Sequence, residues 1–297
     1  MRANWLWAAG LTSVVVLASV LAGQTATKPN SIELFRPGTL RALILSGRNN
    51  HDWRTTTPFI RKLLLASNRF DVRVNEEPAG MTADTLAAYQ VVVLDYNGPR
   101  WGSAAEDGLR DFVQNGNGLV VVHGASWAFN GLPVLGDHHV PTKIIEAPWS
   151  EYRRMIGGVW SAEAPATGHS LRHQFRVKFT DNEHPITKAL GAGFIADDEL
   201  YHHMRMQPDA QILATAYDDP NIKAPWGAVG TGKDEPILWT VAYGKGRVFH
   251  TTLGHDVAAM QVAGFVATLL RGTEWAASAS VTLPPEPLPA EAVAWFR

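Results

Sequence analysis

The chain has 297 residues, a formal net charge of −2 and an ordinary globular composition, with 46% hydrophobic and 18% charged residues. This length allows a sizeable core in one large or two small domains, and the near-neutral charge argues against a nucleic-acid partner. The sequence contains no cysteine, which excludes disulfides, thiolate metal sites and a cysteine nucleophile.

The residue pattern of the N-terminal segment predicts that the protein is exported. Arg2 precedes a largely apolar run at residues 6–22, and small residues follow it where a signal peptidase could cut. This order is typical of a secretory signal peptide, and the run is short for a membrane anchor, which needs roughly 20 apolar residues. We therefore expect a signal peptide at residues 1–23, a polar linker at 24–38, no stable membrane span after cleavage, and a periplasmic or secreted protein.

Strands and helices alternate in the first half of the chain. Short apolar runs bounded by turn residues predict buried strands, and two longer segments have apolar residues at helical spacing. The predicted strands are residues 41–47, 70–74, 89–95 and 119–122, and the predicted helices are 58–67 and 104–115. This order predicts an α/β fold with a doubly wound parallel sheet and right-handed crossovers.

The second half is predicted to begin with an inserted, loop-rich segment and to continue mainly as β-strands. Residues 131–168 have no clear periodicity, whereas alternation or apolar runs predict strands at 175–179, 211–217, 236–243 and 246–253, with a final helix at 257–271. Residues 276–297 hold four closely spaced prolines. They predict an extended C-terminal tail, which either packs on the surface or stays loose.

Polar side chains follow several predicted strands. Ligands of open α/β sheets bind beyond the carboxyl ends of the strands, and three of these loops carry a histidine, which titrates near neutral pH and is a common metal ligand. The structural alternatives are helix capping by Asp52 and a buried His123 bonded to backbone. From these loops we expect catalytic roles for His51, Asp52, His123 and His255, and substrate contacts from Trp53, Asn97, Trp127 and Asp256.

A second cluster of acids and histidines occupies residues 197–203. On a strand, Glu199, Tyr201 and His203 would share one face; on a helical turn, Glu199 would neighbour His202 or His203. Either arrangement brings a carboxylate to an imidazole, as a general base or a divalent metal site requires. The alternative is a solvated surface loop. We expect catalytic Glu199 and His203, a substrate contact from Tyr201, and, if a metal such as zinc is used, ligation by His51, His123, Glu199 and His203.

Two common motifs are absent from the sequence. Gly116 and Gly118 precede a predicted strand rather than a helix, so no nucleotide is expected there. No Gly-x-Ser-x-Gly nucleophile elbow occurs.

Four stretches resemble the ThuA-like, or trehalose-utilisation, family: NNHDW at residues 49–53, GNGLVVVHGASWAF at 116–129, DELYHH at 198–203 and YGKGRVFHTTLGHD at 243–256. They occur in the family's order, and they assign a ThuA-like domain to residues 39–275. The resemblance implies a fold similar to class I glutamine amidotransferases, a flavodoxin-like three-layer sandwich with a mostly parallel sheet. Because this chain has no cysteine, amidotransferase chemistry does not carry over.

The resemblance also implies a role in sugar catabolism, on disaccharides or 3-keto-glycosides. We therefore expect an exported carbohydrate-processing protein that acts by His/Glu acid–base chemistry, with or without a divalent metal, on a small-molecule carbohydrate. One alternative is a non-catalytic sugar-binding protein, in which tryptophans stack on sugar rings. Another is a structural subunit of an exported complex. The sequence leaves homo-oligomerisation open.

Overall fold

The computed structural model describes residues 34–130, 133–135, 141–145, 147–224 and 228–294. The signal peptide expected at 1–23 lies outside the described residues, as does most of the linker. Within the described ranges, no helix combines the length and the apolar character that crossing a bilayer requires.

A nine-stranded mixed sheet organises the fold, in the order β10-β9-β13-β14-β15-β4-β3-β1-β2. β15 is parallel to β4 and antiparallel to β14, so it joins a parallel half to an antiparallel half. The parallel half contains β2 (Phe70–Asn75), β1 (Leu40–Leu45), β3 (Val91–Leu94), β4 (Gly118–Val122) and β15 (Gly246–Thr251). The antiparallel half contains β14 (Asp234–Tyr243), β13 (Gln211–Tyr217), β9 (His173–Phe179) and β10 (Gly193–Asp198).

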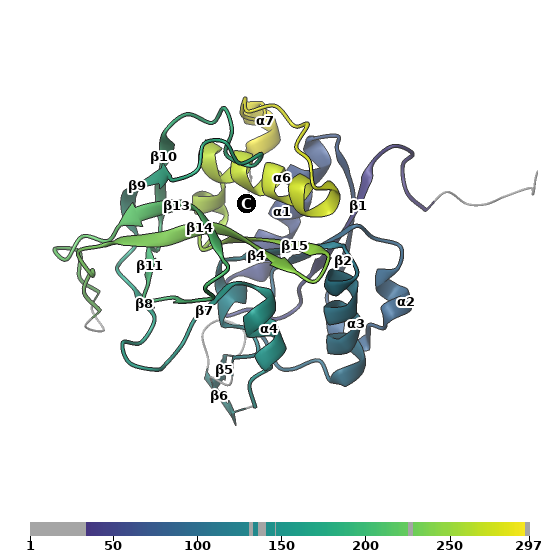
Figure 1. Ribbon diagram of the computed structural model, residues 1–297, viewed down its shortest axis with the longest axis horizontal. Helices are drawn as coiled ribbons and strands as arrows, with labels where there is room; N and C mark the ends of the chain where they lie inside the picture. Colours follow the sequence, from purple (N-terminus) through teal and green to yellow (C-terminus); the bar gives the residue numbers. More distant parts are fainter. Residues whose placement is uncertain (1–33, 131–132, 136–140, 146, 225–227, 295–297) are drawn as a thin grey trace, which may run out of the picture. The chain divides into compact units, whose positions relative to one another are not determined.

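Helices cover both faces of the sheet, which confirms the α/β three-layer prediction. Because successive strand residues point to opposite faces, Val93 packs in the core cluster that contains residues of α1 (Trp53–Ala66) and α6 (Ala263–Ser278). Val92 packs instead with residues of α3 (Ser103–Gln114) and α4 (Ser150–Met155). Figure 1 shows α1 and α6 on one side of the sheet and α3 and α4 on the other.

Short elements fill the connections, including the segment expected to be loop-rich. Three antiparallel pairs form there: β5 with β6, β7 with β12, and β8 with β11. The short strands are β5 (Pro133–Leu135), β6 (Pro141–Ile145), β7 (Gly158–Val159), β8 (Gly168–His169), β11 (Tyr201–His202) and β12 (Arg205–Met206). The short helices are η1 (Pro78–Gly80), α2 (Ala83–Leu86), η2 (His123–Trp127), α5 (Val257–Met260) and α7 (Ala290–Val293).

Two helices differ from their predicted bounds by more than one residue. α1 begins at Trp53 rather than at residue 58, and Pro58 lies inside it. The helix predicted at 257–271 is two helices, because Val262 has extended backbone angles that separate α5 from α6. The strands of the parallel half agree with their predictions to within two residues.

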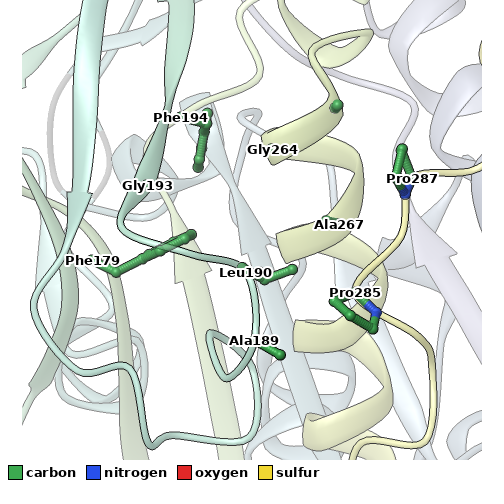
Figure 2. Close-up of a pocket in the computed structure, with 10 residues that line it drawn as sticks. Phe179, Ala189, Leu190, Gly193, Phe194, Gly264, Ala267, Pro285 and Pro287 are labelled. Atoms are coloured by element: carbon green, nitrogen blue, oxygen red, sulfur yellow. The ribbon is translucent and has the colours of Figure 1, made fainter.

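The proline-rich tail packs on the domain. Two of its backbone N–H groups, at Thr282 and Leu283, donate to the carboxylate of Glu274 in α6, and the Arg271 guanidinium donates to the carbonyl of Leu283. The tail, α6 and the turn between β9 and β10 enclose an apolar pocket of about 210 Å³, lined in part by Phe194 and Pro285 (Figure 2). The pocket presents no charged side chain.

Candidate functional site

Four side chains with metal-binding atoms meet at the carboxyl ends of the strands. They are His51, His123, Glu199 and His255, and one ligand atom from each lies within 4.8 Å of those of the others. His51 follows β1, His123 directly follows β4, and His255 follows β15. Glu199 follows β10, from the antiparallel half of the sheet. We call these residues the four-residue cluster.

The spacing of the cluster suits a single tetrahedral ion. The Nε2 atoms of His51 and His123 are 3.2 Å apart, the Nδ1 of His255 is 3.3 Å from Glu199 Oε1, and His123 Nε2 is 3.5 Å from Glu199 Oε2. Two ligands each about 2.0–2.1 Å from a tetrahedral zinc ion are separated by about 3.3 Å. These three of the six separations lie close to the edge length of such a coordination shell. Different oxygens of Glu199 face His123 and His255, and all four ligand atoms lie within 4.8 Å of one another.

Hydrogen bonds on the far side of two rings determine their tautomers. His123 Nδ1 lies 2.6 Å from the carbonyl oxygen of Thr252, and His51 Nδ1 lies 3.2 Å from Asn49 Oδ1. An oxygen acceptor at each Nδ1 places the proton there and leaves a lone pair on Nε2. The two Nε2 lone pairs then face each other at 3.2 Å, an arrangement that a cation between them would stabilise.

A buried carboxylate fixes the orientation of Asn49. The Asn49 amide donates from Nδ2 to Asp95 Oδ1 at 3.0 Å, so its Oδ1 faces His51. Asp95 also accepts hydrogen bonds from the hydroxyls of Thr56 and Thr57 in α1. Burial raises the pKa of Asp95, against the opposing effect of these donors. The contacts link β3, α1 and the loop after β1 into one support for His51.

Asp198 supports the other side of the cluster. Its carboxylate accepts from the backbone N–H of Gly254 at 2.7 Å and from that of Glu199 at 2.8 Å. It also lies 3.3 Å from the backbone nitrogen of His255. Asp198 therefore joins the end of β10 to the loop after β15 and brings Glu199 to His255.

The side chains of the four-residue cluster shift one another's pKa values. Burial alone would raise the pKa of Glu199, but hydrogen bonds and charge from His123 and His255 lower it far below its usual range. Burial lowers the pKa of His255, but Glu199, Asp198 and Asp256 outweigh it and raise that pKa. The site is therefore suited to holding positive charge beside an ionised carboxylate.

A tyrosine and a further histidine lie against the cluster. The Tyr201 hydroxyl is 2.9 Å from His123 Nε2, and burial together with the charges of Glu199 and Asp198 raises its pKa well above the usual value. His169 donates from Nδ1 to the carbonyl of Ser170 at 2.9 Å and lies 3.5 Å from Glu199 Oε1. Burial lowers the pKa of His169, so the neutral ring is favoured.

Aromatic rings continue outward from Tyr201. Trp160 meets Tyr201 edge to face, and it also stacks on Trp127. Trp160 precedes β8 in the segment without periodicity, so no pattern in the sequence pointed to it. His169 likewise lies on a two-residue strand that is paired only in the folded chain.

Two residues expected in the catalytic or metal site do not belong to the four-residue cluster. His203 directly follows β11 and has a left-handed backbone with a φ of 56°, so the strand alternation considered for residues 199–203 does not extend to it. Its backbone N–H donates to Glu235, and His255 completes the cluster instead. Asp52 is an exposed residue at the start of α1 whose carboxylate accepts from Thr55.

The residues expected to contact substrate lie in varied positions. Trp53 is only 8% exposed. Asn97 is buried and donates to Asn50. Asp256 caps α5 through the N–H of Ala259 and also accepts from Arg172. Tyr201 and Trp127 are the two that lie in the aromatic layer beside the cluster.

Comparisons with known proteins agree with this architecture. The family model ThuA, described as trehalose utilisation, matches residues 41–276. A putative ThuA-like protein from Parabacteroides merdae is 32% identical, with a TM-score of 0.68 over 82% of this chain and 92% of that one. A second, from Bacteroides uniformis, is 20% identical, with a TM-score of 0.60 over 83% and 96%.

A cytoplasmic protein from Salmonella typhimurium shares the fold at 13% identity, with a TM-score of 0.54 over 80% of this chain and the whole of that one. No curated protein matches the sequence. Because the family match extends over most of the chain and the first of these structures is also ThuA-like, this chain belongs to the ThuA family, a carbohydrate-related family.

Proposed function

We propose that the chain is a metal-assisted enzyme that acts on a carbohydrate, with a divalent cation bound by the four-residue cluster. The observation that carries the proposal is the pair of Nε2 lone pairs of His51 and His123, which face each other at 3.2 Å while each Nδ1 contacts an oxygen acceptor. Imidazole and carboxylate ligands in a tetrahedral arrangement favour zinc.

A purely structural role explains this arrangement less well. Histidines that stabilise a core by hydrogen bonding pair a donor with each acceptor. The facing Nε2 atoms of His51 and His123 do not supply a donor to each other, although the Tyr201 hydroxyl lies 2.9 Å from His123 Nε2. The Nδ1 of His255 is also buried without a well-aligned hydrogen bond, although Glu199 is 3.3 Å away. A cation would satisfy all three imidazoles at once.

The surrounding residues support chemistry on a 3-keto-glycoside. A divalent cation held by His51, His123, Glu199 and His255 would supply Lewis-acid polarisation of a carbonyl oxygen, which would acidify the neighbouring C–H bond. His169, whose Nδ1 contacts the Ser170 carbonyl and lies 3.5 Å from Glu199 Oε1, would accept that proton at Nε2. The glycosidic C–O bond on the next carbon then breaks, and the Tyr201 hydroxyl would protonate the departing oxygen. Water adds across the resulting double bond and completes the cleavage.

The experiment has two arms. Metal content of protein purified without chelators tests the site, and release of free sugar from a 3-keto-disaccharide, with and without a chelator, tests the reaction. We expect about one zinc per chain and sugar release that the chelator abolishes. A chain that binds no divalent metal and releases no sugar would refute the proposal. Metal and sugar binding without release would identify a binding protein instead.

We also propose that the protein works outside the cytoplasm, on the basis of the apolar N-terminal run. Mass spectrometry of protein expressed with its native N-terminus tests this. A mature chain that starts near residue 24 supports export, and retention of residues 1–23 in the cytoplasmic fraction contradicts it.

A further inference from the structure

Two tryptophans form a stacked pair beside the four-residue cluster. The ring centroids of Trp127 and Trp160 are 5.2 Å apart, with an angle of 11° between the rings. Trp160 meets Tyr201 at 4.8 Å, and Tyr201 meets His123 at 4.6 Å. Two successive ring contacts therefore connect the stacked pair to a residue of the cluster.

The pair is fixed to the same turn as His123. Trp127 is the last residue of η2, which begins at His123. The backbone N–H of Trp160 donates to the carbonyl of Ser126, in the same turn, at 3.1 Å. A rigid aromatic surface loses little conformational entropy when a ligand binds. The pair can therefore hold a ligand at a fixed position relative to the cluster.

Both rings are half-buried, unlike Trp53 and Trp101, which are 8% and 6% exposed. In the part of the chain that the structure describes, Trp160 is the one aromatic ring that contacts Trp127. Because both tryptophans are half-buried, each keeps part of its surface accessible to a ligand. A flat apolar face of this kind suits the C–H face of a pyranose.

We propose that Trp127 and Trp160 bind the second, non-reacting ring of a disaccharide, while the first ring lies against the four-residue cluster. This inference rests on the proposed function, because it takes the cluster as the site of reaction. Trp160, the nearer tryptophan of the pair, is two ring contacts from His123, a separation that two linked pyranose rings can span. The pair would therefore select disaccharides over monosaccharides.

The test compares trehalose with glucose as probes, by calorimetric titration of the full-length mature protein in the presence of zinc. Trp127→Leu removes the flat ring and retains apolar volume, and Trp127→Phe retains a smaller ring. The control is Trp275→Phe, on α6, whose ring contacts His184 rather than the aromatic layer. Circular dichroism and thermal melting establish that each variant is folded.

We expect Trp127→Leu to weaken trehalose binding about tenfold and glucose binding less than about twofold. The trehalose affinity of Trp127→Phe should lie between those of the wild type and Trp127→Leu, and the affinity of the control should equal that of the wild type. Trehalose binding that Trp127→Leu leaves unchanged overturns the inference. So does an equal loss for both sugars, or a wild type that binds neither sugar.

A zinc titration of the same samples separates this inference from the proposed function. Zinc binding that is intact in all variants, together with the sugar pattern above, supports both. If zinc binding is intact but the tryptophan substitutions do not change sugar binding, only the role of the tryptophans is refuted. If the wild type binds no zinc, the metal site is refuted.

Discussion

Asp95 sets the tautomer of His51 without contacting it. The carboxylate binds the Asn49 amide nitrogen at 3.0 Å, which turns the amide oxygen toward His51 Nδ1. Asn49 Oδ1 also accepts the backbone N–H of His51. Contacts of this kind behind a metal-ligating histidine fix the ring and direct its second nitrogen at the ion.

Replacement of Asn49 by leucine should therefore weaken metal binding. The His51 ring would lose its acceptor at Nδ1, so the proton could move to Nε2 and block ligation. We expect zinc affinity to fall by about 10- to 100-fold, measured by competition with a chromophoric chelator. Asn221→Leu, in an exposed loop, should leave the affinity unchanged. An equal affinity for Asn49→Leu and the wild type would show that the amide does not orient His51.

Gly124 lies against the same histidine, next to its contact with Asn49. A Cβ added at Gly124 would lie 2.7 Å from His51 Nδ1 and 3.1 Å from Asn49 Oδ1, closer than ordinary contacts allow. Gly124→Ala should displace His51 and lower zinc affinity by about tenfold or more. The matched control is Gly80→Ala, where a Cβ meets nothing within 4 Å. If both variants bind zinc equally, His51 is not confined by this contact.

Loss of a ligand should have a larger effect than loss of its support. His123→Ala removes an imidazole that contacts His51, Glu199 and Tyr201, so zinc content should fall to a small fraction of the wild-type value. His173→Ala, at the start of β9 and outside the cluster, is the control. Elemental analysis after dialysis measures the zinc content of both variants and of the wild type. Full zinc occupancy of His123→Ala would place the metal elsewhere.

The sequence carries most of the information for the parallel half of the sheet. β1, β3 and β4 are largely apolar runs, as expected where both faces are covered, and His51, His123 and His255 lie in the segments that follow β1, β4 and β15. The rule that sites form beyond the carboxyl ends of strands therefore sufficed to group these three residues.

The remainder of the site depends on tertiary contacts that no local pattern encodes. Glu199 reaches His255 because Asp198 binds the backbone of the β15 loop. His169 and Trp160 lie in and beside two-residue elements whose pairing arises only in the folded chain. On a strand, His203 would share a face with Glu199, but β10 ends at Asp198 and His203 has a left-handed backbone.

Glu274 should stabilise the packed C-terminal tail in a pH-dependent manner. Its carboxylate is fully buried, pairs with Arg69 at 2.7 Å and accepts the N–H groups of Thr282 and Leu283. Burial alone would raise the pKa of Glu274, but hydrogen bonds from Thr282, Leu283 and Arg69 lower it below its usual range. Because the folded pKa is the lower one, this stability is present above the unfolded pKa, near 4.5, and is lost as the pH falls through the folded pKa.

Glu274→Gln should therefore lower the free energy of unfolding by about 1–3 kcal/mol at neutral pH, since the charge-assisted hydrogen bonds are lost. The difference between wild type and variant should shrink progressively below pH 4.5, as the wild-type carboxylate takes up its proton. Urea denaturation across this pH range measures both quantities. Glu183→Gln, at a side chain that is 88% exposed, should change stability little at any pH. A Glu274→Gln deficit that stays constant into acid would mean that the lost stability comes from packing rather than from the ionised carboxylate.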